Sequence, residues 1–301
     1  MLGPKEDRYF SNGFKGIDIS YNDEEVYQGQ YKATIAVGFG VWAKKKGTVL
    51  TPHLGTTEFI SVAAVVCQQL MEKSVGLSPE IIKRAWINHF NCKMKPCDDT
   101  DYDNIPVSGK IVSEQKELDH VVYGFEVRIG SVLIKPVVCS PLKEIKEANS
   151  RQDQEVDHQE TDNYKEGYKL RDLEIKDVHV DREMMVSGGK TILHEQIHSQ
   201  KGLGAHYHGI LLTDFILITG QLTQALLCHI NCKTRTESSN LWLREIDAWC
   251  ETPSEGKYFD SEVRFSNVQT LQTRGEKWLS VGLTGTVGNI HSRIKVAQRV
   301  N

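Results

Sequence analysis

TEFISVAAVVCQQLME at residues 57–72 and TDFILITGQLTQALLC at residues 213–228 are two versions of one segment, 156 positions apart. In each version apolar residues recur at spacings of three and four, which predicts a helix with one face in a hydrophobic core. Matching residues keep this offset before, through and beyond the helix: Ile19/Ile175, Thr57/Thr213, Phe59/Phe215, Ile60/Ile216, Gln68/Gln224, Leu70/Leu226 and Trp86/Trp242. A repeat of this kind dictates architecture, so the sequence predicts a duplicated domain with one long helix in each copy.

Segments typical of strands surround each predicted helix, because their residues alternate or run apolar. They lie at 16–20, 31–39, 110–113, 121–129 and 131–139 in the first copy, and at 262–265, 277–284 and 294–297 in the second. One long helix wrapped by an antiparallel sheet is the hotdog arrangement. The sequence therefore predicts an α+β fold, a tandem (double) hotdog whose two copies pack as a pseudo-dimer.

A polar stretch separates the two copies. Residues 141–167 contain few large apolar side chains, many charges and no period that would bury a face. We predict an N-terminal hotdog domain at 1–145, a charged linker at 146–166 and a C-terminal hotdog domain at 167–301. A chain of 301 residues is long enough for two separate cores.

The composition excludes several classes of protein. With 36 basic and 40 acidic residues the net charge is −4, so the chain lacks the basic excess that binding to nucleic acid requires. The N-terminus has no apolar signal core, and no run is long enough to span a bilayer. We therefore expect a cytoplasmic protein without a nucleic-acid or membrane partner. Seven cysteines, an odd number, indicate free and mostly buried thiols.

Candidate catalytic residues gather around the starts of the two predicted helices. Glu58 and Asp214 lie in the first turns, and His53, His206 and His208 lie on the preceding turns. Helix N-terminal amides can polarise a carbonyl oxygen, the carboxylates can act as bases, and the histidines can transfer a proton. His208 is the leading catalytic candidate. The alternative is structural: the two acids only stabilise the positive helix ends, by about 0.3–1 kcal/mol each, and the histidines bond turn carbonyls.

Gln68 and Gln224 lie about three turns into the predicted helices. A buried amide needs hydrogen-bond partners, and the oxygens of an acyl thioester are one candidate for that role. The other candidate is a bond within the protein, across the pseudo-dimer helices. Both glutamines are therefore predicted substrate-binding residues with a structural alternative.

His194-Glu195-Gln196-Ile197-His198 matches the H-E-x-x-H motif, which on a helix holds zinc with the glutamate as general base. Here the motif falls in a stretch predicted to be a strand, where the two histidines would be roughly 13 Å apart at ~3.3 Å per residue. We expect no metal and no cofactor, because neither a glycine-rich phosphate loop nor a dinucleotide fingerprint is present. A zinc metallohydrolase remains an alternative function.

Several short motifs resemble those of the avirulence D proteins, over nearly the whole chain. They are Leu2-Gly3-Pro4, Arg8-Tyr9-Phe10, Gly13-Phe14-Lys15, Thr51-Pro52-His53-Leu54-Gly55 before the first helix, and His206-Tyr207-His208-Gly209 before the second. The resemblance implies a role in making syringolide-type acyl glycoside elicitors, and a fold similar to A-factor-synthase-type and hydroxyacyl carrier-protein dehydratase hotdogs. Those dehydratases carry an acid on the central helix, but no acid lies deep in either helix here, which disfavours dehydration.

The resemblance also implies the reaction and its partners. A medium-chain 3-oxoacyl thioester, on a carrier protein or on CoA, would be transferred to or condensed with a five-carbon ketose or its phosphate, giving an acylated sugar or butenolide-type signal. A hotdog protein that binds an acyl ligand without turning it over is the non-catalytic alternative. A homo-oligomer of the pseudo-dimer is left open.

Overall fold

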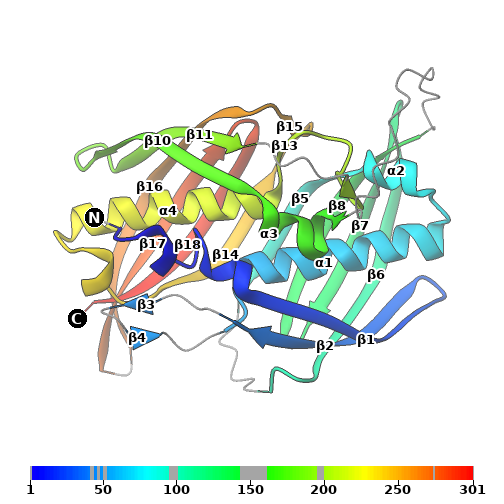
Figure 1. The fold of residues 1–301 in the computed structure, drawn as a ribbon, viewed down its shortest axis with the longest axis horizontal. Coiled ribbons are helices and arrows are strands. Elements are labelled where there is room, and N and C mark those ends of the chain that lie inside the picture. Colours follow the sequence, from blue (N-terminus) through cyan, green and yellow to red (C-terminus); the bar gives the residue numbers. More distant parts are fainter. Residues whose placement is uncertain are drawn as a thin grey trace.

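The computed structural model describes residues 2–40, 44–45, 48–49, 53–94, 101–142, 161–194, 200–273 and 275–300. Within them, twelve strands form one antiparallel sheet in the order β1-β2-β6-β7-β8-β5-β14-β18-β17-β16-β11-β10 (Figure 1). Their bounds are β1 Ile17–Tyr27, β2 Gln30–Phe39, β5 Trp86–Lys93, β6 Ile105–Lys116, β7 His120–Ile129, β8 Val132–Pro141, β10 Asp172–Asp181, β11 Val186–His194, β14 Leu241–Trp249, β16 Tyr258–Thr273, β17 Glu276–Val287 and β18 Ile290–Val300.

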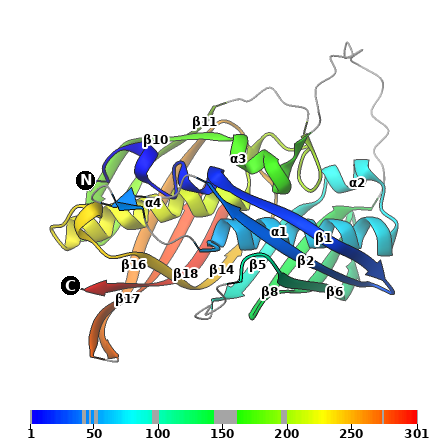
Figure 2. The ribbon, with the colours of Figure 1, turned by 60° about the horizontal axis from the view of Figure 1, so that its bottom comes forward.

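Two long helices lie on the same face of this sheet (Figures 1 and 2). They are α1 (Thr56–Leu70), which continues into the π-helical turn η3 (Met71–Val75), and α4 (Leu212–Ile230). Most residues of both helices are buried, because the sheet covers one side and further segments cover the other. The remaining elements are short: η1 Lys5–Asp7, η2 Gly13–Gly16, β3 Lys44–Lys45, β4 Thr48–Val49, α2 Pro79–Lys83, β9 Thr161–Asp162, η4 Asn163–Gly167, α3 Tyr168–Leu170, β12 Gln200–Lys201, β13 Gly209–Ile210, η5 Arg235–Glu237 and β15 Ser254–Glu255.

The two halves of the sheet are related by a pseudo-two-fold axis at the junction of β5 and β14. These strands pair antiparallel, with Asn91 opposite Asp247. The difference 247 − 91 is 156, the offset of the sequence repeat, so equivalent residues meet each other on the axis. The strand order is mirrored about this junction, with six strands on either side. The predicted tandem hotdog fold is thereby confirmed.

One part of the predicted linker is folded. Residues 161–166 form β9 and most of η4, in which Asp162, Asn163 and Tyr164 are buried. Asp162 accepts hydrogen bonds from the Tyr164 and Lys165 amides. Polar side chains that the sequence predicts to be solvated are therefore hydrogen-bonded within the protein. Residues 146–160 lie outside the described residues, and the domain boundaries themselves stay predictions.

No helix among the described residues is long and apolar enough to cross a bilayer. The cysteines that the structure describes are free thiols, and all of them except Cys232 are buried.

Candidate functional site

A cavity of about 240 Å³ lies where α1 of the first half begins beside the second half. Its walls come from the first turn of α1, one side of α4, strands β14 and β18, the start of β6, the β7–β8 turn and the N-terminal segment. Most lining side chains are apolar; the polar and aromatic ones include Tyr9, His53, Thr219, Thr223, Trp242 and Arg244. This is the position that the sequence predicted for chemistry, at a helix start of one copy beside the sheet of the other.

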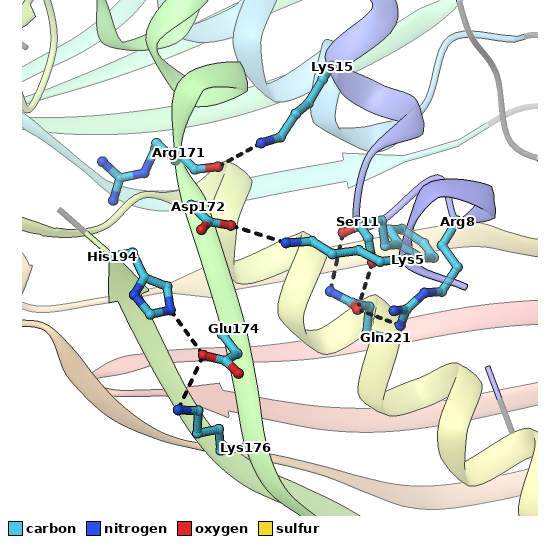
Figure 3. Close-up of polar contacts among 11 residues, drawn as sticks. Lys5, Arg8, Ser11, Lys15, Arg171, Asp172, Glu174, Lys176, His194 and Gln221 are labelled. Atoms are coloured by element: carbon cyan, nitrogen blue, oxygen red, sulfur yellow. Dashed lines mark hydrogen bonds and ion pairs between the residues drawn. The ribbon is translucent and has the colours of Figure 1, made fainter. Parts of the chain in front are cut away.

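The N-terminal segment reaches this cavity by crossing to the second half of the molecule. Its side chains bond to α4 and to the start of β10 (Figure 3): Lys5 Nζ to Asp172 Oδ1 at 3.2 Å, Arg8 Nη1 and Ser11 Oγ to Gln221 Oε1 at 3.2 and 3.0 Å, and Lys15 Nζ to the Arg171 carbonyl at 3.1 Å. The Gln221 amide in turn donates to the Phe10 carbonyl at 3.2 Å. These contacts hold Tyr9 and Phe10 in the cavity wall.

Tyr9 connects the cavity to a buried acid. Its hydroxyl donates to Glu58 Oε2 at 2.6 Å, and the Gly55 amide donates to the same oxygen at 2.8 Å. Glu58 is fully buried, and its other oxygen, Oε1, has no hydrogen-bond partner among the described residues. Burial raises the pKa of the Glu58 carboxyl to about 7, although the bonds from Tyr9 and Gly55 oppose that rise. Glu58 can therefore hold or release a proton near neutral pH.

The start of α1 is open to a ligand because its N-cap is a glycine. Gly55 has no side-chain oxygen to accept from the first-turn amides, which have no acceptor within the helix. Gly55 and Thr56 both line the cavity. A Cβ at position 55 would collide with the Tyr9 hydroxyl, so glycine is needed for Tyr9 to reach Glu58. Free amides at a helix N-terminus stabilise a negatively charged oxygen.

His53 stands at the same end of the cavity. Its ring lies 4.9 Å from that of Trp242, with the two planes inclined by 30°. Both residues line the cavity, and the Trp242 side chain is 40% exposed. An imidazole next to helix-terminal amides can exchange a proton with a reacting hydroxyl. Of the three histidines predicted from the sequence, His53 is the one that lines this cavity.

The other predicted histidines lie elsewhere on the surface. His208 is exposed, and its carbonyl accepts from the Gly256 amide at 2.8 Å, next to the short β13–β15 pair. His206 is also exposed; its amide donates to the Lys83 carbonyl at 2.9 Å, and its ring packs edge-on against Tyr207. The 156-residue offset explains why neither histidine occupies the position of His53 in the second half: the residue equivalent to His53 is Gly209. The structure does not bring His206 or His208 into the cavity.

Asp214, the equivalent of Glu58, is bound inside the protein. Its Oδ2 accepts from Arg171 Nε at 2.7 Å and from the Leu211 amide at 2.8 Å, and Arg171 also donates to the Gly209 carbonyl. Burial raises the pKa of the Asp214 carboxyl, and the Arg171 guanidinium opposes that rise. The cavity at this helix start measures only about 40 Å³, since Tyr164, Leu203 and Tyr207 occupy its walls. Asp214 is therefore engaged in an ion pair that holds the protein together, in contrast to Glu58.

The predicted glutamines differ from each other. Gln68 Nε2 donates to Asp162 Oδ2 and its Oε1 accepts from the Leu203 amide, both at 3.2 Å; these bonds lie within the protein but do not cross between the two long helices. Gln224 is half-buried and is not among the residues that line the cavity.

His194 of the H-E-x-x-H motif is the last residue of β11, a strand rather than a helix. It is exposed, and its Nε2 lies 3.1 Å from Glu174 Oε2 (Figure 3). The other four residues of the motif, 195–198, lie outside the described residues. Among the described residues no group of three or more His, Cys, Asp or Glu side chains could hold a metal ion.

Changing Glu58 to glutamine should alter how stability depends on pH. The folded-state pKa of about 7 exceeds the ordinary 4.5, so the folded protein keeps a proton that the unfolded chain loses as pH rises between these values. Wild-type stability should therefore fall across this window. Glutamine cannot ionise, so the free energy of unfolding of the variant should rise by roughly 3 kcal/mol relative to that of wild type as the pH increases from 4.5 to 7.

Urea denaturation of both proteins at several pH values from 4.5 to 8 measures this difference. Glu72→Gln, at an exposed position just beyond α1, is the control and should follow the wild-type slope. Parallel pH profiles for wild type and Glu58→Gln would contradict the assignment of a raised pKa to Glu58.

The chain is similar to one protein family and to several solved structures. A family model described as Pseudomonas avirulence D protein matches residues 1–301. No curated protein sequence matches the chain. Among similar solved structures is a tesB protein from Mycobacterium avium subspecies paratuberculosis, with 9% identity over 93% of this chain and 96% of that chain and a TM-score of 0.42. A conserved hypothetical protein with a double hotdog fold from Mycobacterium tuberculosis is 11% identical over 84% of each chain, with a TM-score of 0.44. A 12:0-ACP thioesterase from Umbellularia californica is 11% identical over 89% of this chain and 94% of that chain, with a TM-score of 0.39.

Proposed function

The chain belongs to the avirulence D protein family, and from this premise we propose that it is a biosynthetic enzyme acting on a 3-oxoacyl thioester. The acyl group would be transferred to, or condensed with, a five-carbon ketose or its phosphate. One observation carries the proposal: an apolar cavity ends at the glycine N-cap of α1, beside His53 and the Tyr9–Glu58 pair. The acyl chain fits the apolar part, and the reacting carbonyl belongs at the helix end.

The acyl chain would lie between the two halves. Ile216 and Thr223 of α4, with Ile294 and Val296 of β18, supply its wall from the second half, and Phe59 supplies it from α1. Burying a methylene group contributes about 0.8 kcal/mol, so a medium-length chain has enough surface for specific binding. The 3-oxo and thioester oxygens remain at the polar end.

The chain's own groups support acyl transfer at that end. The amides at the start of α1 would stabilise the negative charge that develops on the thioester carbonyl oxygen. The sugar hydroxyl would attack the carbonyl carbon and pass its proton to His53. As the carbon–sulfur bond breaks, His53 would return the proton to the departing thiolate. The Tyr9–Glu58 pair would position the helix start and hold a second proton close to the reacting centre.

A single site per chain is part of the proposal. The equivalent helix start in the second half has a cavity about one sixth as large, and its acid is paired with Arg171. His53 has glycine as its counterpart there. The second half would therefore supply a wall of the first site and no chemistry of its own.

Mass spectrometry of the purified protein with a medium-chain 3-oxoacyl thioester and a five-carbon ketose or ketose phosphate tests the reaction. The expected product has the summed mass less the thiol, or less the thiol and one water. Intact thioester after long incubation with each partner would contradict an enzymatic role. Binding of the thioester without turnover would then favour the non-catalytic alternative.

Filling the cavity should abolish the reaction. Thr223 lines the cavity and is 3% exposed, so Thr223→Phe places a ring where the acyl chain would lie. We expect binding of a non-reactive thioether analogue, measured calorimetrically, to weaken at least tenfold. Thr223→Ser keeps the space open and is the matched control. Equal affinities of the two variants would place the acyl chain elsewhere.

A further inference from the structure

The β16–β17 hairpin extends beyond the rest of the sheet (Figure 2). On one side, β16 pairs with β17 along nearly its whole length, as far as Thr273 opposite Glu276. On the other side, β11 pairs only with residues 258–264 of β16. Residues 266–273 thus have an open backbone edge in the part of the chain that the structure describes. All eight are exposed.

This open edge differs from the two outermost strands of the sheet. β1 carries Asp23, Glu24 and Glu25, and β10 carries Glu174 and Asp177. Each also contains a bulge, with positive φ at Asp23 and Asp177. Charges and bulges are the usual means by which proteins prevent strand edges from pairing with other chains. Both outermost edges therefore resist a second strand.

The open segment of β16 lacks such charges, and its bulge lies only at its first residue, Ser266, so that residues 267–273 pair regularly with β17. Its sequence, SNVQTLQT at 266–273, contains no charge, no proline and no glycine. Val268 and Leu271, which are 39% and 47% exposed, are the large apolar residues of this segment. The equivalent hairpin of the first half also extends past its neighbour, because β2 pairs only with residues 105–110 of β6. There, however, Glu114 and Lys116 stand on the open edge.

We propose that residues 266–273 pair antiparallel with the same residues of a second copy of this chain, joining two sheets into one across a two-fold axis. Backbone donors and acceptors of an antiparallel edge complement their own copy in this orientation. With the axis at Thr270, Thr270 faces its counterpart and Leu271 faces Gln269. No register opposes like charges, since the segment has none. The acidic edges of β1 and β10 would repel their own copies.

Sedimentation velocity of the full chain over a range of concentrations tests the proposal. The expected result is a monomer–dimer equilibrium. Leu271→Lys places a cation on the paired strands of both copies and should shift the dissociation midpoint at least tenfold towards monomer. Gln269→Lys, also exposed, repeats the test should the first variant fold poorly. Gln115→Lys adds the same charge at the equivalent position of the β6–β7 hairpin, and it should leave the equilibrium unchanged.

Three outcomes would overturn the proposal. One is a monomer at every concentration. Another is a dimer that persists in both lysine variants of β16, which would place the interface elsewhere. The third is unchanged hydrogen exchange at 266–273 between dilute and concentrated protein. None of these measurements depends on acyl transfer, so the result is independent of the proposed function.

Discussion

Replacing Arg171 with methionine should lower the free energy of unfolding by about 3–5 kcal/mol, because it leaves the buried Asp214 carboxylate without its charged partner. Asp214 is completely buried, and Arg171 is 8% exposed. The guanidinium also donates to the Gly209 carbonyl, so that acceptor would lose its bond as well. Urea denaturation at neutral pH gives the difference directly.

A double variant separates the charge effect from packing. Arg171→Met combined with Asp214→Asn removes both charges while keeping an oxygen for the Leu211 amide. We expect it to recover part of the lost stability, since truncating one partner of a buried pair costs more than replacing both. If the two single variants simply add in the double variant, the ion pair is not a unit and the interpretation fails.

Replacing His53 with alanine should reduce turnover of the acyl thioester by about 10²–10⁴-fold, the range that general acid–base catalysis contributes. His53 lines the cavity, so its loss removes the proton acceptor that we propose for the sugar hydroxyl. Affinity for a thioether analogue should change little. Steady-state kinetics of the two proteins, with kcat and KM determined separately, distinguish a loss of chemistry from a loss of binding.

Matched histidine variants make this test specific. His53→Phe keeps a ring against Trp242 but cannot accept a proton, so it should be as inactive as alanine. His206→Ala and His208→Ala change exposed histidines outside the cavity and should leave turnover unchanged. Activity that survives in His53→Phe but not in His208→Ala would return the catalytic role to the histidine favoured by the sequence.

Some elements of the fold could not be found from the sequence. β5 and β14 join the two halves, yet neither is among the strands predicted from alternation. Each contains a bulge, between Ile87 and His89 in β5 and between Leu243 and Glu245 in β14, and a bulge interrupts the alternation that marks a strand. Trp242 follows from the repeat as a matched residue, but the repeat does not say that it lines a cavity.

The sequence by itself determined the duplication, the two central helices and the tandem hotdog fold. These follow from helical periodicity and from a constant 156-residue offset, which are both properties of neighbouring or matched positions. It also placed acids at both helix starts.

Only the tertiary structure decided which helix start is a candidate site. Tyr9 reaches Glu58 across 49 residues of sequence, and Arg171 reaches Asp214 across 43. Two equivalent acids thus receive opposite environments, one beside an open cavity and the other in an ion pair. Burial and through-space partners set these differences, and neither is encoded in local spacing.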